Sequence, residues 1–280
     1  MVYGVLQLIN FAHSEVFMVG VFGGLYALKA LSGGPEGGIV LVALIGTAIV
    51  AGMAVSGLTA VVLERLAYRP LRRRGAPRLS FLISAIGASL FIQNLFFVWS
   101  SVGGPAPRPY PIVMTRRTAF TLFGYQVSNQ QILIVATMIL MYVLLDRFVM
   151  GSHMGRGIRA VAEDPETAGM MGVNIDRVIV VTFLVGGLMA GAAGVLYGIY
   201  FGQAFFFVGF IPGIKAFTAA VLGGIGNIRG ALLGGLLLGL AESVGVTCVR
   251  SVWEDVIAFL ILVAVLMFRP SGLLGEAVRG

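Results

Sequence analysis

Three ionisable residues, Glu15, Lys215 and Glu242, lie inside or beside long apolar stretches of this sequence. A charged side chain at the centre of a membrane helix costs about 2.5–3.5 kcal/mol on insertion scales, so it usually faces a cavity or a partner. Glu15 and Glu242 fit a wet, structural position at a membrane interface as well as a functional one. Lys215 is more central, and two roles stay open for it: lining a transport pathway, or forming a structural bridge with Glu242.

The one sizeable segment with charges of both signs is 155–178, and its middle predicts a short capped helix at 165–171. Asp164 is a good N-cap, because its carboxylate accepts hydrogen bonds from free backbone N–H groups. A proline follows at the first helical position, and Glu166 suits the positive end of the helix dipole. Gly172 supplies the left-handed residue that ends the helix. The segment is either a docking element or a solvated connection between two membrane helices.

Two glycine-rich patterns, 155–160 and 223–230, invite a nucleotide-binding interpretation that the sequence does not support. Neither follows a predicted strand or opens a parallel βαβ unit, which dinucleotide binding requires. The chain has two lysines and neither lies in a P-loop, so ATP-driven work must come from another chain. The histidines and the single cysteine, Cys248, stand far apart, and one cysteine excludes an intrachain disulfide. We expect no cofactor, no metal and no covalent catalysis.

The composition is that of a membrane protein. The chain has 280 residues, of which 58% are hydrophobic and 11% charged, against roughly 25% charged in soluble domains. Apolar runs of about twenty residues recur, each long enough to cross a ~30 Å hydrocarbon core. The formal net charge of +7 comes mainly from arginines in the connections, which fits lipid headgroups and topology control rather than nucleic acid. The predicted fold class is an all-α, polytopic transmembrane bundle formed by a single domain, 1–280.

Eight membrane spans are predicted, after an N-terminal stretch, 1–12, that is too short to cross and counts as a partial helix. One span is interrupted by Pro212 and Gly213, and a broken membrane helix exposes backbone groups that only protein or a watery cavity satisfies. In another span, small residues recur at every fourth position and form a flat stripe for helix packing. The predicted spans are 16–31, 39–63, 79–99, 131–150, 179–201, 208–222, 231–247 and 256–268.

The distribution of arginines predicts the orientation. The connection 64–78 carries six arginines, and the long connection 100–130 carries three. Because the side of a membrane protein richer in Lys and Arg is usually cytoplasmic, 64–78 is predicted as a cytoplasmic loop. Alternation of the spans then puts 100–130 outside, and makes 151–178, with the helix 165–171, the second cytoplasmic loop.

Five stretches, in this order, carry a resemblance to a known family: YGVLQLINFAHSEVFMVG (3–20), ERLAYRPLR (64–72), LISAIG (82–87), MGRGIRAVAEDPETAGMMGVNIDRVI (154–179) and KAFTAAVLGGIGNIRGALLGGLLLGLAE (215–242). Over nearly its whole length, the chain resembles the permease subunits of branched-chain amino acid ABC importers, specifically the H-type subunit of the Leu/Ile/Val system. The resemblance implies a multi-pass permease of the bacterial inner membrane, without an ATPase site of its own.

The resemblance also implies a role for the capped helix. ABC permeases have a cytoplasmic coupling helix, of pattern Glu-Ala-Ala-x-x-x-Gly, that docks on the ATPase subunit, and 166–172 is similar, with Thr167 in place of the middle alanine. The distal Ile-x-Leu-Pro portion of other permease families is missing. The residues expected in coupling are Glu163, Asp164, Glu166, Ala168 and Gly172. The residues expected along the translocation path are Asn10, His13, Glu15, Lys215 and Thr218.

The implied partners are a second, homologous permease chain in a heterodimer, two cytoplasmic ATP-binding subunits, an extracytoplasmic substrate-binding protein and membrane lipids. Nucleic acid is not among them. Two departures from the family pattern stand near the start. Ser14 replaces a glycine, which stiffens that turn, and the family has further apolar sequence before Tyr3 that completes a first membrane helix. The expectation is therefore either a start codon assigned too late or a missing first helix.

Two other functions stay open. The first is an ABC permease for urea, short amides or other amino acids, because relatives look alike in the motif regions. The second is a secondary transporter driven by an ion gradient, with Glu15, Lys215 and Glu242 as a relay.

Overall fold

The computed structural model describes residues 10–31, 34, 37–122, 124–248, 251–269 and 271–275, and it confirms the all-α membrane class. Within these ranges, six helices are long and apolar enough to cross a membrane, and α10 (Phe210–Gly223) is a shorter apolar helix. With α12 (Glu254–Phe268) they match the eight predicted segments, although α10 and α12 have only 14 and 15 residues. The predicted partial helix lies, up to residue 9, outside the described residues. The six long helices are α2 (His13–Leu31), α3 (Gly38–Leu63), α5 (Arg78–Val98), α6 (Asn129–Gly151), α9 (Ile175–Phe201) and α11 (Ile228–Cys248).

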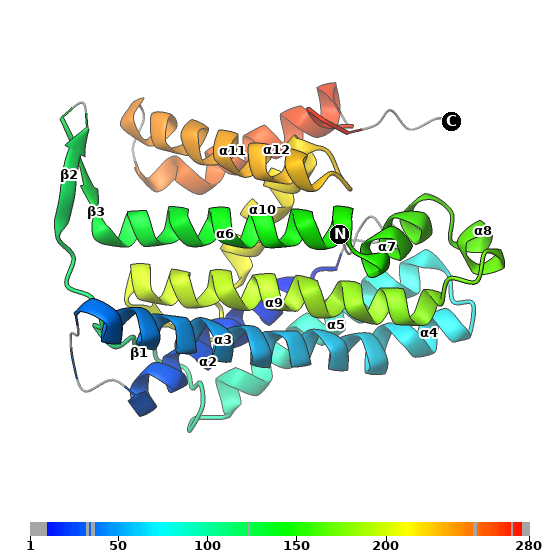
Figure 1. Ribbon diagram of the computed structural model, residues 1–280, viewed down its shortest axis with the longest axis horizontal. Helices are drawn as coiled ribbons and strands as arrows, with labels where there is room; N and C mark the ends of the chain where they lie inside the picture. The colour runs from blue at the N-terminus through cyan, green and yellow to red at the C-terminus, as the bar shows by residue number, and fades with distance from the viewer. Residues whose placement is uncertain are drawn as a thin grey trace.

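Shorter elements join these helices. The connection that follows α5 contains β1 (Arg108–Pro109) and a hairpin of β2 (Thr118–Leu122) and β3 (Tyr125–Ser128). Strand β1 pairs antiparallel with β4 (Gln203–Ala204), just after α9. At the opposite end of the molecule from the hairpin lie α4 (Arg69–Arg73), α7 (His153–Glu163) and α8 (Pro165–Met170), as Figure 1 shows. The remaining short helices are the π-turn η1 (Glu64–Tyr68) and the 3₁₀ turn η2 (Ser251–Trp253).

The centre of the bundle is formed by α2, α3 and α9, which approach one another backbone to backbone. A Cβ atom added to Gly191 of α9 would lie 2.4 Å from the carbonyl oxygen of Gly52 in α3, and one added to Gly20 of α2 would lie 2.6 Å from the Cα of Gly191. The buried Ser56 hydroxyl of α3 donates to the carbonyl of Val16 in α2 at 2.8 Å. The small-residue stripe of α9 is therefore a packing surface, as predicted.

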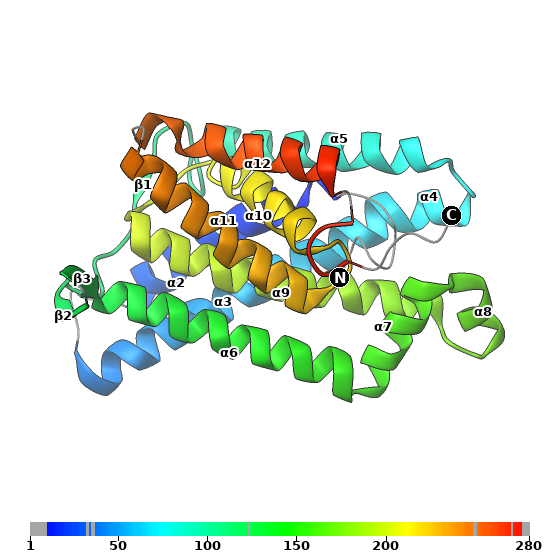
Figure 2. The same ribbon diagram turned by 90° about the horizontal axis from the view of Figure 1, so that it is seen from above.

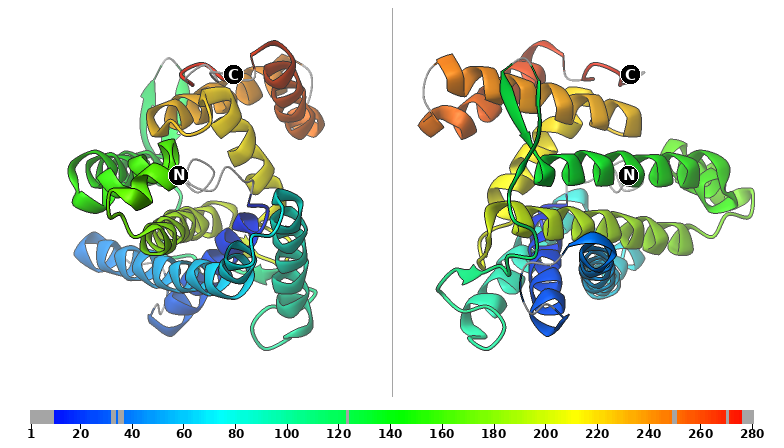
Figure 3. Two further views of the ribbon diagram at one scale, coloured as in Figure 1. Left: turned by 90° about the vertical axis from the view of Figure 1, so that its right-hand side faces the viewer. Right: turned by 60° about the vertical axis from the view of Figure 1, so that its left-hand side comes forward.

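Helices α10, α11 and α12 form a second group; α11 and α12 lie at the top of Figure 1 and of the left view in Figure 3, and α10 runs up to them from the centre of the bundle. Figure 2 shows α5 and α6 along opposite sides of the molecule, with α9 between them. The start of α10 lies against the start of α2, because a Cβ on Gly213 would be 2.6 Å from the Cβ of Ser14. Arg229 of α11 pairs with Asp146 of α6 at 3.3 Å.

The predicted break at Pro212 and Gly213 is wrong. Helix α10 begins at Phe210, so Pro212 lies in its first turn, where the missing N–H costs no helical hydrogen bond. The non-helical segment between α9 and α10 is 202–209 instead, and it begins at Gly202, which has a φ of +72°.

The prediction of 64–78 as a loop is also wrong in its local structure. The chain stays helical from α3 through the π-turn η1 and α4 as far as Arg73, and turns only at 74–77. Tyr68 holds this extension against the bundle, since it is 1% exposed and packs against the rings of Phe81 and Phe183. The side of the membrane on which these arginines lie stays a prediction.

The connection after α5 is partly buried in the bundle. Tyr110, next to β1, is 4% exposed, and its hydroxyl donates to the carbonyl of Val21 at 3.2 Å. A Cβ on Gly24 or on Gly198 would lie 2.5 Å or 2.3 Å from this side chain, so two glycines make room for the ring. Burial raises the pKa of the Tyr110 hydroxyl. The connection after α5 thus contributes a core residue, which the sequence did not predict.

Candidate functional site

The helix predicted at 165–171 is present as α8, one residue shorter, and both ends are held by local bonds. Asp164 Oδ1 accepts from the backbone N–H groups of Glu166 at 2.9 Å and Thr167 at 3.2 Å, and the Thr167 hydroxyl donates to Oδ2. These bonds, above all the one from the Thr167 hydroxyl, hold the pKa of the Asp164 carboxyl below its usual range. Gly172 follows the helix with a φ of +85°, a left-handed conformation that favours glycine.

Helix α8 has one buried residue and otherwise faces outward. Ala168 is 4% exposed and lies in an apolar cluster with residues of α7 and α9. Glu163 and Glu166 are exposed, and Met170 and Met171 are 76% and 81% exposed. Methionine side chains adapt to irregular partner surfaces. The outer surface of α8 therefore has the carboxylates and the adaptable apolar side chains that a protein partner can bind.

Single residues join α8 to the helices before it. Ser152 ends α6 and caps α7, because its hydroxyl accepts from the backbone N–H of Gly155 at 2.9 Å. Asp164 likewise ends α7 and caps α8. Val161 of α7 is 1% exposed and packs in the same cluster as Ala168. With no linker between them, α7 and α8 form one rigid corner.

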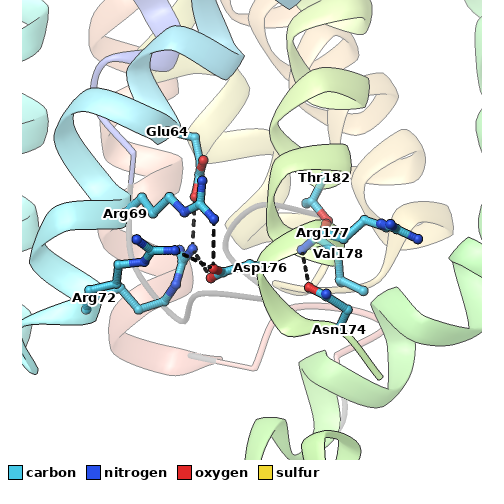
Figure 4. A network of polar contacts seen from close by, with 9 residues as sticks. Glu64, Arg69, Arg72, Asn174, Asp176, Arg177, Val178 and Thr182 are labelled. Carbon is cyan, nitrogen blue, oxygen red and sulfur yellow. Dashed lines mark hydrogen bonds and ion pairs between the residues drawn. The ribbon is translucent and has the colours of Figure 1, made fainter. Parts of the chain in front are cut away.

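An ionic cluster lies where α9 begins, a few residues after α8 (Figure 4). Asp176, in the first turn of α9, accepts from two arginines of α4: Arg72 Nη2 donates to Oδ1 at 2.7 Å, and Arg69 Nη2 donates to Oδ2 at 3.2 Å. Arg73 Nη2 is 3.7 Å from Oδ2 and adds an ion pair. Asn174 caps α9 by accepting from the N–H of Arg177 at 2.9 Å. Both carboxylate oxygens of Asp176 are thus bound by α4.

Glu64 completes the cluster from the π-turn η1. Its side chain is fully buried, and its Oε1 accepts from Arg72 Nη2 at 3.0 Å, so one guanidinium joins two carboxylates. Glu64 Oε2, Arg69 Nε and Arg72 Nη1 are buried and have no partner among the described residues. Because a buried charge is tolerated only when it is paired, Glu64 depends on Arg72.

Two of the predicted path residues lie at the start of α2. Asn10 Oδ1 accepts from the Tyr68 hydroxyl at 2.8 Å and from the backbone N–H of Ala12 at 3.1 Å, so this side chain ties the start of α2 to η1. His13 is the first residue of α2 and is half-buried. The hydrogen bonds of Asn10 are those of a structural contact.

Glu15 is buried between α2 and α5. The residue is 1% exposed, and its Oε1 accepts from the hydroxyls of Ser14 at 3.3 Å and Ser89 at 3.1 Å. Its Oε2 has no partner among the described residues. An unpartnered buried carboxylate oxygen calls for an explanation, such as a proton or a cationic ligand.

Lys215 pairs with carboxylates of two other helices. Its Nζ lies 3.2 Å from Glu242 of α11, 2.7 Å from Glu254 and 3.0 Å from Asp255 of α12. The structural bridge between Lys215 and Glu242 is therefore confirmed and includes two further acids. Thr218, one turn along α10, is fully buried, and its hydroxyl donates to the carbonyl of Ile214 at 3.0 Å.

The five path candidates do not meet at one point. Glu15 is bound to α5, whereas Lys215 is bound to α11 and α12. All five coupling candidates, from Glu163 to Gly172, lie in α8 or directly beside one of its ends. In the parts of the chain that the structure describes, no group of three His, Cys, Asp or Glu side chains is placed to hold a metal ion.

Sequence reasoning missed the cluster of Asp176, Glu64 and the α4 arginines. The signal was available in part. Asp176 is a carboxylate three residues before the predicted span 179–201, and Glu64 precedes the run of arginines. No local pattern indicated that these two segments come together. Arg72 and Asp176 are 104 residues apart in the sequence.

Comparisons with known proteins agree on one family. Residues 1–266 match the family model described as the permease component of branched-chain amino acid transport systems. The high-affinity branched-chain amino acid transport system permease protein BraD of Pseudomonas aeruginosa is 41% identical over 279 residues, covering 99% of this chain and 89% of BraD. The corresponding LivH proteins of Escherichia coli K12 and Salmonella typhimurium are 40% and 39% identical over 280 residues, covering 99% of this chain and 88% of each relative. No solved structure matches the chain.

Proposed function

This chain belongs to the family of branched-chain amino acid permease components, and from that premise we propose that α8 is the coupling helix on which a cytoplasmic ATPase subunit binds. A permease is a transport subunit rather than an enzyme, and the sequence contains no P-loop. The work of ATP hydrolysis must therefore enter through a surface that this chain presents to another subunit. The capped, outward-facing helix α8 is that surface.

The local structure of α8 supports this proposal. The Asp164 cap, the Gly172 turn and the buried Ala168 fix its orientation, while Glu166 and Met170 remain exposed. A helix that is rigid on one side and open on the other can receive a displacement and pass it on without unfolding. ATP binding closes the ATPase pair, the coupling helices are drawn together, and the path alternates between outward and inward access.

The assembly that we propose has a second homologous permease chain, two cytoplasmic ATP-binding subunits and an extracytoplasmic substrate-binding protein. In the orientation that the arginines predict, α4, α7 and α8 lie on the cytoplasmic side of a bacterial inner membrane, and the β2–β3 hairpin lies on the opposite side. Large apolar side chains on the outer faces of α5 and α6, such as Phe91 and Leu140, which are 68% and 54% exposed, support contact with lipid tails and with the second permease chain.

Along the path, Glu15 is the candidate with the best physical support. Its unpartnered Oε2 suits the ammonium group of an amino acid, and its hydrogen bond with Ser89 puts it beside α5. His13 lies two residues before Glu15, on a different face of α2. Asn10 Oδ1 and the Thr218 hydroxyl are hydrogen-bonded within the chain, and Lys215 is paired with three acids, so we propose that these three residues shape the path rather than bind a substrate.

Branched-chain amino acids are the substrates that we propose, because BraD and LivH, both named for this transport, cover 99% of the chain. The test is uptake into proteoliposomes that contain the permease pair, its ATPases and the binding protein. Radiolabelled leucine should enter when ATP is supplied on the side of the membrane that holds the ATPases. Unlabelled isoleucine and valine should compete with it. Competition by urea alone would refute the substrate assignment.

The same vesicles test the energy source. Uptake should stop when the ATPases are omitted and should survive an uncoupler. Uptake that survives without the ATPases and collapses with the uncoupler would instead favour a relay of Glu15, Lys215 and Glu242.

Substituting residues on the outer face of α8 should release the ATPases during purification. Retention of the ATPases after Met170 and Glu166 are both replaced by Ala would count against α8 as their binding surface.

A further inference from the structure

We propose that Asp176 is a positioning residue that links the coupling helix to the transmembrane bundle, so that α8 and the α2–α3–α9 bundle move as one body. This inference rests on the proposed function of α8 and names the part of the chain that transmits its displacement. The link consists of Asp176 at the start of α9, Arg69 and Arg72 of α4, and Glu64 of η1.

The first step is the short, stiff connection between α8 and Asp176. Gly172 donates to the carbonyl of Gly169 and Val173 donates to that of Ala168, both at 3.0 Å, so the chain turns tightly out of α8. A Cβ on Gly169 would lie 3.3 Å from the Cδ1 of Ile175, the first residue of α9. The second residue of α9 is Asp176, only four residues after Gly172. A displacement of α8 therefore reaches the Asp176 carboxylate with little slack.

The second step runs from Asp176 to α4. The carboxylate is bound at both oxygens, by Arg72 at 2.7 Å and by Arg69 at 3.2 Å (Figure 4). Two charge-assisted hydrogen bonds from two side chains fix the carboxylate in direction as well as distance. Since α4 continues α3 without a loop, the cluster ties the first turn of α9 to the extended end of α3.

The third step concerns what the link adds to the packing. Farther along, α3 and α9 pack through glycines, and the closest approach, between Gly52 and Gly191, lies about four helical turns from Asp176. Near α8, the apolar cluster around Ala168 and Val178 is nondirectional. Among the described residues, the ionic cluster supplies the directional contacts between the first turn of α9 and α4. Without it, α8 can shift on its apolar contacts while α3 and α4 stay in place.

Burial decides which substitution tests the link cleanly. Glu64 is fully buried and is held by Arg72, so removing Arg72 would leave an uncompensated buried carboxylate and disturb folding. The Asp176 side chain is 37% exposed. Asp176→Asn removes the charge, keeps a polar side chain of the same shape in the first turn of α9, and leaves the Arg72–Glu64 pair in place.

The experiment uses the complete complex in proteoliposomes, with ATPases and binding protein present. Three quantities are measured for each variant: ATPases retained on purification, ATP hydrolysed, and leucine taken up. We expect Asp176→Asn to retain the ATPases and to hydrolyse ATP, but to take up at least about fivefold less leucine per ATP, the lower end of typical coupling effects. Asp176→Glu, which keeps the charge, should restore the ratio. Asp146→Asn, which removes the ion pair between α6 and α11, is the matched control and should leave the ratio unchanged.

A ratio within twofold of wild type in Asp176→Asn would overturn the inference, and so would a loss that Asp176→Glu does not restore. If Asp176→Asn does not assemble, Arg69→Gln decides. The Arg69 side chain is 33% exposed and binds Oδ2 of Asp176, the oxygen that Arg72 does not bind. Arg69→Gln must therefore reduce the ratio of uptake to ATP hydrolysis in the same way. Failure of the proposed function has a different signature: the wild-type permease would not retain the ATPases, or would retain them after the outer face of α8 is replaced.

Discussion

Replacing Gly172 by valine isolates the conformation of the turn after α8 from any effect of packing. Gly172 has a φ of +85°, and a Cβ added there would meet nothing within 4 Å. The cost of valine is therefore the cost of the left-handed backbone, about 1–2 kcal/mol for an L-residue and more for a β-branched one. That shifts the population of the native turn by a factor of roughly 5–30. Asn, which tolerates this conformation, should have a much smaller effect.

The assay compares Gly172→Asn and Gly172→Val in the reconstituted complex, and measures ATPase retention and ATP-driven leucine uptake. We expect uptake to fall in the order wild type, Asn, Val, because the turn sets the direction of α8 and the position of Asp176. Gly124→Val is the matched control. Gly124 has a φ of +82°, also with nothing within 4 Å, but it lies in the turn of the hairpin at the other end of the molecule (Figure 1). Undiminished uptake with full ATPase retention in Gly172→Val would refute this account of α8.

Three further predictions concern stability and pH. Gly191→Ala should lower the melting temperature of the permease by several degrees, because the added Cβ would lie 2.4 Å from a backbone oxygen and overpacking costs about 1–3 kcal/mol. Gly46→Ala is the control and should not lower it, because a Cβ there would have nothing within 4 Å. Lys215→Met should lower the melting temperature because three carboxylates lose their shared cation, and adding Glu242→Gln should recover part of the loss. The folded-state pKa of Asp164 lies below its ordinary 3.8, so its carboxylate stabilises α8 above that value and the stabilisation is lost as the pH falls through the lowered pKa. Amide exchange in α8 should therefore accelerate in acid, and Asp164→Asn, which caps without titrating, should remove that dependence.

The membrane class, the eight apolar segments and the ends of α8 could be predicted because they depend on local sequence. The length of an apolar run indicates a span, and Asp164 and Gly172 act through bonds and dihedral angles within a few residues. The small-residue stripe of α9 was interpretable for the same reason, since its period alone indicates a packing face. These features need no knowledge of where other segments lie.

The rest depends on tertiary contacts. Pro212 was expected to break a helix, but a proline in a first turn is indistinguishable in sequence from one in a helix interior until the start of α10 is known. The arginines after α3 were expected in a loop, but their partner Asp176 and the buried Tyr68 keep them helical. Lys215 had two interpretations, and only the approach of α11 and α12 decided for the bridge. Tyr110 carried no signal of burial at all.

The glycine contacts among α2, α3 and α9 also limit where a solute can cross. Where a Cβ on one helix would already clash with a backbone carbonyl of the next, as between Gly191 and Gly52, there is no side-chain layer to rearrange into a passage. Tyr110, from the connection after α5, fills the contact between α2 and α9 at Gly24 and Gly198. We therefore propose that the transported substrate travels beside this triple-helix wall rather than through it, on the flank where α5 bears Ser89 against the buried carboxylate of Glu15.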